Sequence, residues 1–80
     1  MEEPIRKSFI FYKSFADALA CMESEEREDA LLVLFNYCFY WIEPDIEAFS
    51  KPIQLFFLSI KPIVDRDIER YENKIKYNSY

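Results

Sequence analysis

Residues 30–42 read ALLVLFNYCFYWI, and Asn36 is the one polar side chain among them. The run is shorter than the roughly 20 apolar residues that a membrane-spanning helix needs. Charged residues and a proline close it on both sides, namely Glu28, Asp29, Glu43, Pro44 and Asp45. The stretch therefore predicts a buried core helix rather than a membrane span.

This helix is expected to run from about Glu25 to Trp41, with Ser24 as its N-cap and acidic residues in its first turn. One apolar face is formed by residues 31, 34, 35, 38, 41 and 42, and Val33, Tyr37 and Tyr40 cover much of the other. A helix that is apolar nearly all round is buried on several sides. We therefore expect it to lie in the middle of the domain, or to present one face to another chain. Tyr40 and Trp41 are expected in the core or at the end of the bundle.

Two further helices are predicted on either side of it. The first spans about Ser8 to Met22, with an apolar stripe of Phe11, Phe15, Leu19 and Met22, and its FIF start is also compatible with an extended segment. The third spans about Pro52 to Lys76, with a stripe of Ile53, Phe57, Ile60, Val64, Ile68, Tyr71 and Ile75. In the connection between the middle and the third helix, Glu43-Pro44 is expected to end the middle helix, and residues 45–49 are compatible with a single helical turn.

Pro62 conflicts with a helix interior, because its ring opposes the carbonyl of Leu58. We expect the long helix to be kinked there, or two helices to meet at Lys61-Pro62. A helix of this length spans roughly 36 Å, against roughly 22 Å for the first one. Its C-terminal end should therefore overhang its neighbours, and a second copy or another protein would cover the stripe there.

Composition places the chain in the all-α class. It has 80 residues, 51% of them hydrophobic and 19% aromatic, and it has no glycine. Without glycine, the tight turns that join β-hairpins are missing. We expect one helical domain over residues 1–80, a small bundle of three to four helices.

The residue types disfavour catalysis. The chain has no histidine, and it lacks a glycine-rich phosphate loop. Cys21 and Cys38 lie on apolar segments, where we expect buried thiols rather than a disulfide or a nucleophile. We predict no enzymatic activity, no cofactor and no metal.

Charge is divided unevenly along the chain. Residues 17–47 carry nine acidic side chains and one basic, whereas residues 48–80 carry six basic and four acidic ones. The acidic part would attract a basic groove on a partner protein, although an acidic surface is also a general solubility device. The candidate partner-binding residues are Glu25, Glu26, Glu28 and Asp29 at the start of the middle helix, and Arg66, Arg70, Tyr71 and Ile75 on the overhang. Acidic residues interleaved with the last group make direct nucleic acid binding an unfavoured role.

Two motifs carry a resemblance. KSFIFYKSF at residues 7–15, and the pattern Ile60-Lys61-Pro62, Asp65 and Arg70-Tyr71-Glu72-Asn73, look like a small uncharacterised domain of phage and prophage proteins of low-GC bacteria. The resemblance implies that, in related proteins, this domain lies at the N-terminus and is followed by a DnaD-like or winged-helix replication domain. The chain departs from that pattern by stopping at Tyr80, so we expect either a truncated protein or a stand-alone module.

Two functions follow as hypotheses. One is an anti-CRISPR-type inhibitor that docks on a basic nucleic-acid-binding protein of the host. The alternative is an oligomerisation or scaffold domain of a phage replication protein, with a homodimer through the C-terminal helix. Both place the chain in the cytoplasm of a bacterial host, since its start, MEEPIRKSF, is no secretory signal.

Overall fold

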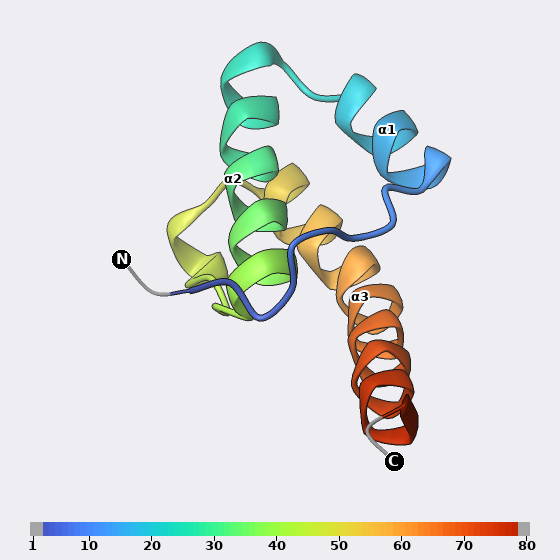
Figure 1. The fold of residues 1–80 in the computed structure, drawn as a ribbon. Helices are drawn as coiled ribbons and strands as arrows, with labels where there is room; N and C mark the ends of the chain where they lie inside the picture. Colours follow the sequence, from blue (N-terminus) through green and yellow to red (C-terminus); the bar gives the residue numbers. More distant parts are fainter. Residues whose placement is uncertain (1–2, 79–80) are drawn as a thin grey trace.

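Three α-helices form the body of the protein in the computed structural model, which describes the backbone of residues 3–78 and the side chains of residues 3–72. In chain order the helical elements are α1 (Lys13–Ala20), α2 (Ser24–Tyr40), the 3-10 turn η1 (Ile46–Ala48) and α3 (Lys51–Asn78) (Figure 1). No strand occurs between residues 3 and 78. The predicted all-α class is confirmed.

Helix α2 buries Leu34 and Cys38 of the expected face, together with Val33 and Tyr37 of the other face. Its buried residues are Ala30, Val33, Leu34, Tyr37 and Cys38, which recur at steps of three and one along a single stripe. Phe35, Trp41 and Ile42 were assigned to the buried side and are exposed. The apolar side chains of α2 lie on nearly all of its sides, so their periodicity does not determine which face is buried. The packing of α3 and the N-terminal segment selects it.

Helix α3 buries the predicted stripe from Ile53 to Ile68 and adds Phe56 to it. It is one continuous helix that contains Pro62, so the alternative of two helices meeting at Lys61-Pro62 is wrong. Leu58 and Pro62 both face solvent, where water can satisfy the carbonyl that lacks an N–H partner. A kink at Pro62 stays a prediction.

The C-terminal end of α3 extends past α1 and α2, as its length predicted (Figure 1). The molecule measures 47 × 28 × 17 Å, and this overhang contributes to the longest dimension. Tyr71 on this end is 41% exposed. The side chain of Ile75, the last residue of the predicted stripe, lies outside the described residues.

Residues 3–12 form an extended strap rather than the first turns of a helix, so α1 begins five residues later than predicted. The N–H of Ile5 donates to the carbonyl of Phe39 at 2.6 Å, and the Phe9 ring packs edge-on against that of Phe39 at 5.1 Å. Phe11 is exposed as a result, whereas Phe15 and the rest of its predicted stripe are buried. The strap crosses in front of α2 on its way to α1 (Figure 1).

Helix α2 ends at Tyr40 with Trp41 as its C-cap, within one residue of the predicted range, so the helix stops before Glu43-Pro44. Trp41 has a left-handed backbone, with φ of 52°, and its N–H donates to the carbonyl of Tyr37 at 3.0 Å. The N-cap is Glu23 rather than Ser24, and its side chain makes no capping hydrogen bond. The single turn expected after the helix is present as η1.

Candidate functional site

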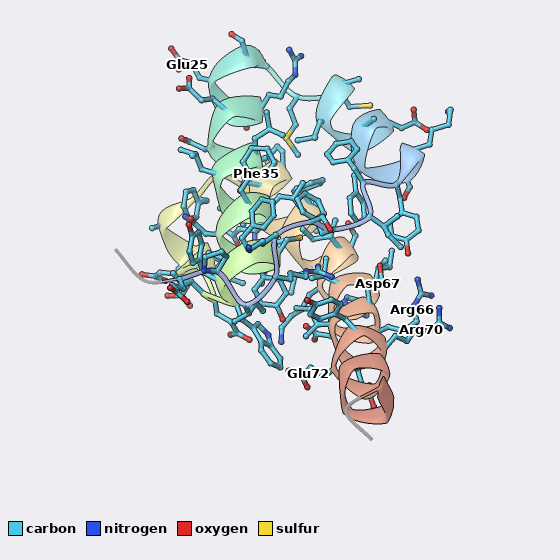
Figure 2. The ribbon with its side chains drawn as sticks, viewed as in Figure 1. Glu25, Phe35, Arg66, Asp67, Arg70 and Glu72 are labelled. Atoms are coloured by element: carbon cyan, nitrogen blue, oxygen red, sulfur yellow. The ribbon has the colours of Figure 1, made fainter. Side chains whose placement is uncertain are left out.

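The predicted acidic contact residues gather at the N-terminal end of α2. Glu25, Glu28 and Asp29 are exposed there, and Glu26 accepts a hydrogen bond from Ser50 Oγ at 2.7 Å (Figure 2). Arg27 is the one basic residue of this region, and it turns back to α1. Its Nε and Nη2 donate to the carbonyls of Leu19 and Met22 at 3.0 and 2.9 Å. Arg27 therefore stabilises the turn between α1 and α2 through these backbone carbonyls. The charge of its guanidinium is directed to the turn rather than to the neighbouring carboxylates.

A groove of about 380 Å³ lies beside this acidic end. We call it the α2–η1 groove; its lining residues are Asp29, Leu32, Val33, Asn36, Ile42, Pro44, Asp45, Ala48 and Phe49. Most of these are apolar. Leu32 is 54% exposed and Ile42 is 49% exposed, so apolar surface that the core does not use is available here. Of the four predicted acidic contact residues, Asp29 is the one that lines the groove.

The predicted basic residues lie on the other side of the molecule, around a hydrogen-bonded Tyr12–Asp67 pair. Tyr12 Oη donates to Asp67 Oδ2 at 2.7 Å, and Arg66 Nη2 lies 3.5 Å from Asp67 Oδ1. Arg66 and Arg70 extend from the same side of α3 (Figure 2). Arg66, Arg70 and Tyr71 are all exposed on this part of α3.

A second cavity, of about 300 Å³, opens beside these residues. We call it the Arg6 pocket; it is lined by Arg6, Ser8, Phe9, Ile10, Asp67, Arg70 and Tyr71. The sequence did not single out Arg6. No periodic signal could have found it, because its burial depends on contact with a residue 32 positions away.

A third polar cluster joins the end of α2 to α3. Tyr37 Oη donates to Asp65 and accepts from Trp41 Nε1 at 3.2 Å, while Lys61 Nζ lies 2.9 Å from Glu43. Burial, reinforced by the hydrogen bond to Asp65, raises the pKa of Tyr37 to about 12. The hydrogen bond to Glu43 raises the pKa of Lys61. Both shifts keep Tyr37 neutral and Lys61 positively charged at neutral pH.

The two cysteines are free and have different surroundings. Cys38 is buried as predicted, and burial raises the pKa of its thiol to about 11, so the thiol stays protonated at neutral pH. Cys21 was also expected to be buried and is exposed, because it ends α1 at the turn into α2.

Two further structural findings concern the described residues. Within residues 3–72, no group of three or more Cys, Asp or Glu side chains is placed to hold a metal ion. No helix in the described part of the chain combines the length and the apolar character that crossing a membrane requires.

Comparisons with known proteins add a family and no function. No curated protein matches the chain, and no solved structure matches it. One family model, described as a family of unknown function, matches residues 8–80, which is most of the chain. The match includes α1, α2, η1 and α3 and begins within the strap. The chain therefore belongs to the family of unknown function DUF6291.

Proposed function

We propose that this chain is a non-enzymatic protein-binding module, encoded by a phage or prophage, and that its α2–η1 groove receives a basic and apolar segment of a partner protein. One observation carries the proposal: exposed Leu32 and Ile42 line a groove that also contains Asp29 and Asp45. An apolar anchor flanked by lysine or arginine complements both features.

The energetic case rests on the apolar lining. Burying a leucine-sized side chain is worth about 1.5–3 kcal/mol, so one partner side chain seated against Leu32 and Ile42 would supply much of the affinity of a weak complex. Charge pairs at the exposed carboxylates would add little affinity each, but they would orient the partner and speed its association.

The partner we favour is a basic nucleic-acid-binding protein of a bacterial host, which the module would inhibit as anti-CRISPR proteins do. The chain carries a net charge of −5, concentrated between Asp17 and Glu47. A negative surface of this kind attracts the positively charged channel in which such proteins hold nucleic acid. The resemblance to phage domains described above supports the same origin.

Affinity purification from host cells with three baits tests the proposal: the unchanged protein, Leu32→Arg and Leu55→Arg. Leu55 is an exposed leucine on α3 that does not line the groove, so its variant is the matched control. We expect the unchanged bait and Leu55→Arg to retain a basic nucleic-acid-binding protein, and Leu32→Arg to lose it.

Salt gives an independent readout of the same complex. Raising the salt concentration from about 0.1 to 0.5 M screens exposed charge pairs and should weaken the complex. Recovery of an acidic partner would contradict the proposed charge of the partner. A partner that the Leu32→Arg bait still retains would contradict the α2–η1 groove as its binding site.

A second candidate function is the oligomerisation or scaffold domain of a phage replication protein. The overhang of α3 favours it, because Tyr71 is 41% exposed on a helix end that extends past α1 and α2 (Figure 1). Sedimentation at high micromolar concentration should then show a dimer, and Tyr71→Glu should dissociate it, since a charge in an apolar contact is costly. A monomer under these conditions would rule this version out.

A further inference from the structure

Arg6 is a buried cation whose charge is not matched by a carboxylate in the described structure. It is 7% exposed, and no carboxylate oxygen of the described residues lies within 4.0 Å of its guanidinium nitrogens. Buried arginines are almost always paired, because removing an isolated charge from water is costly. The side chain therefore has unused capacity to bind an anion.

The structure holds this side chain in place from two directions. Its Nε donates to the carbonyl of Cys38 at 2.9 Å, and its guanidinium carbon lies 5.9 Å from the centre of the Phe9 ring. The adjacent backbone bond from Ile5 to Phe39 fixes the strap against α2. The guanidinium is therefore positioned before any ligand arrives, which lowers the entropic cost of binding.

The two terminal nitrogens of Arg6 make no hydrogen bond to another described residue. Among the described residues, the bond from Nε is the one hydrogen bond that its side chain donates. No buried side-chain nitrogen in that part of the chain lacks a partner, so the two terminal nitrogens keep contact with solvent. Arg6 lines the Arg6 pocket, so this cavity is the route by which an anion would reach the two nitrogens.

Asp67 lines the same cavity, but its carboxylate oxygens interact with Tyr12 and Arg66. It is 9% exposed; one of its oxygens accepts the Tyr12 hydroxyl, and the other lies 3.5 Å from Arg66. Arg70 adds a second guanidinium to the lining, and Ser8 adds a hydroxyl. The lining thus carries two positive charges against one negative charge, in a protein whose net charge is −5.

We propose that the Arg6 pocket binds an oxyanion carried on an aromatic ring, a small aryl carboxylate or aryl phosphate. Arg6 binds the anion in the fork geometry that guanidinium offers to carboxylate and phosphate, and Arg70 closes over it from α3. The rings of Phe9 and Tyr71 line the cavity and supply the contact for the aromatic body. The site is separate from the α2–η1 groove, since the two linings share no residue.

Nuclear magnetic resonance titration of the full chain tests this directly. The probes are phenyl phosphate, benzoate, inorganic phosphate and phenol, followed through the Arg6 Nε–H signal and the backbone amides of Ser8 and Ile10. We expect saturable shifts with phenyl phosphate or benzoate, weaker binding of inorganic phosphate, and none with phenol. The two aryl anions separate the phosphate form of the ligand from the carboxylate form.

Two variants with the same change in net charge separate a site from a general charge effect. Arg70→Gln should weaken binding about tenfold, as the loss of a charged hydrogen bond does. Lys13→Gln should leave binding unchanged, because Lys13 lies on α1 in an exposed pair with Asp17 and does not line the cavity.

Arg6→Lys tests the buried residue while keeping its charge, and it should bind at least tenfold more weakly because lysine lacks the fork. If this variant does not fold, Arg70→Gln still decides the outcome. The proposal is overturned if neither aryl anion gives saturable shifts, or if Lys13→Gln weakens binding as much as Arg70→Gln does.

Discussion

Tyr12 donates a hydrogen bond of 2.7 Å to Asp67, and this bond joins the N-cap residue of α1 to a carboxylate 55 positions later on α3. Arg66 Nη2 approaches the same pair, at 3.3 Å from the Tyr12 hydroxyl and 3.5 Å from the Asp67 carboxylate. The contact fixes the strap where it turns into α1. It also engages the Asp67 carboxylate, the one negative group in the lining of the Arg6 pocket, with Tyr12 and Arg66.

A double-mutant cycle of Tyr12→Phe and Asp67→Asn should show that this pair is coupled. Hydrogen bonds to charged groups contribute about 1.5–3 kcal/mol, so we expect a coupling energy of about 1–2 kcal/mol. Urea unfolding of the four proteins measures it. Additive effects of the two substitutions would mean that the bond makes no net contribution to stability.

The buried face of α2 can be tested by truncating two leucines two positions apart. Leu34 is fully buried, so Leu34→Ala should destabilise the fold by about 2–5 kcal/mol through lost contacts and a residual cavity. Leu32 is exposed, and Leu32→Ala should change the stability by no more than about 0.5 kcal/mol. Thermal unfolding followed by circular dichroism compares them. Equal losses of stability in the two variants would contradict the assignment of Leu34 to the buried face of α2 and of Leu32 to the exposed one.

Trp41 adopts a left-handed conformation that a side chain with a Cβ disfavours. Trp41→Gly and Trp41→Ala both remove the indole and its hydrogen bond to Tyr37, so their difference isolates the backbone. We expect the glycine variant to be more stable than the alanine variant by about 1 kcal/mol. Chemical denaturation measures the difference, and an alanine variant as stable as the glycine variant would show that the backbone leaves this conformation once the indole is gone.

Pro62 should be a destabilising residue inside α3. It lacks the N–H that would bond to Leu58, and it is exposed, so little packing is lost when it is replaced. Pro62→Ala should raise stability by up to about 3 kcal/mol, the difference in helix propensity between the two residues. Leu58→Ala, at another exposed position on α3, controls for the loss of exposed apolar surface without a change in the backbone. An unchanged or lower melting temperature in Pro62→Ala would show that the ring makes favourable contacts.

The free energy of unfolding should fall at alkaline pH, because Tyr37 keeps its proton to a higher pH in the folded state than in the unfolded chain. Its pKa is raised from 10.0 in the unfolded chain to about 12 in the fold, so the folded state binds more protons in this range. The stabilisation is fully present below pH 10 and is lost as the pH rises toward 12, by an amount on the order of 2 kcal/mol.

Tyr37→Phe removes this titration and should flatten the loss above pH 10. A loss of similar size, starting near pH 9, should remain in that variant, because burial raises the pKa of the Cys38 thiol from 9.0 to about 11 and acts in the same direction. Urea unfolding at a series of pH values measures both proteins. Identical pH profiles would exclude Tyr37 as the responsible group.

Local patterns were sufficient for much of the fold. The regular spacing of apolar residues from Ile53 to Ile68 predicted the buried face of α3, because only one stripe of that helix is apolar enough to form a core. The length of α3 relative to α1 predicted its overhang, since helix length follows directly from residue count. The acidic start of α2 and the basic residues on α3 were visible as charge patterns, because exposed charges need no tertiary partner to be recognised.

Other features depend on contacts between distant residues. Helix α2 is apolar almost all round, so the choice of Val33 over Phe35 for the core follows from the shape of its neighbours. Arg6 is buried because the strap packs on α2, and its chemical environment comes from Cys38, Phe9 and Asp67, which lie on different elements. The sequence alone was therefore enough for the extent of α2 and for the charges of α2 and α3. The α2–η1 groove and the Arg6 pocket exist only once the helices and the strap are packed, because their linings come from segments that no local periodicity connects.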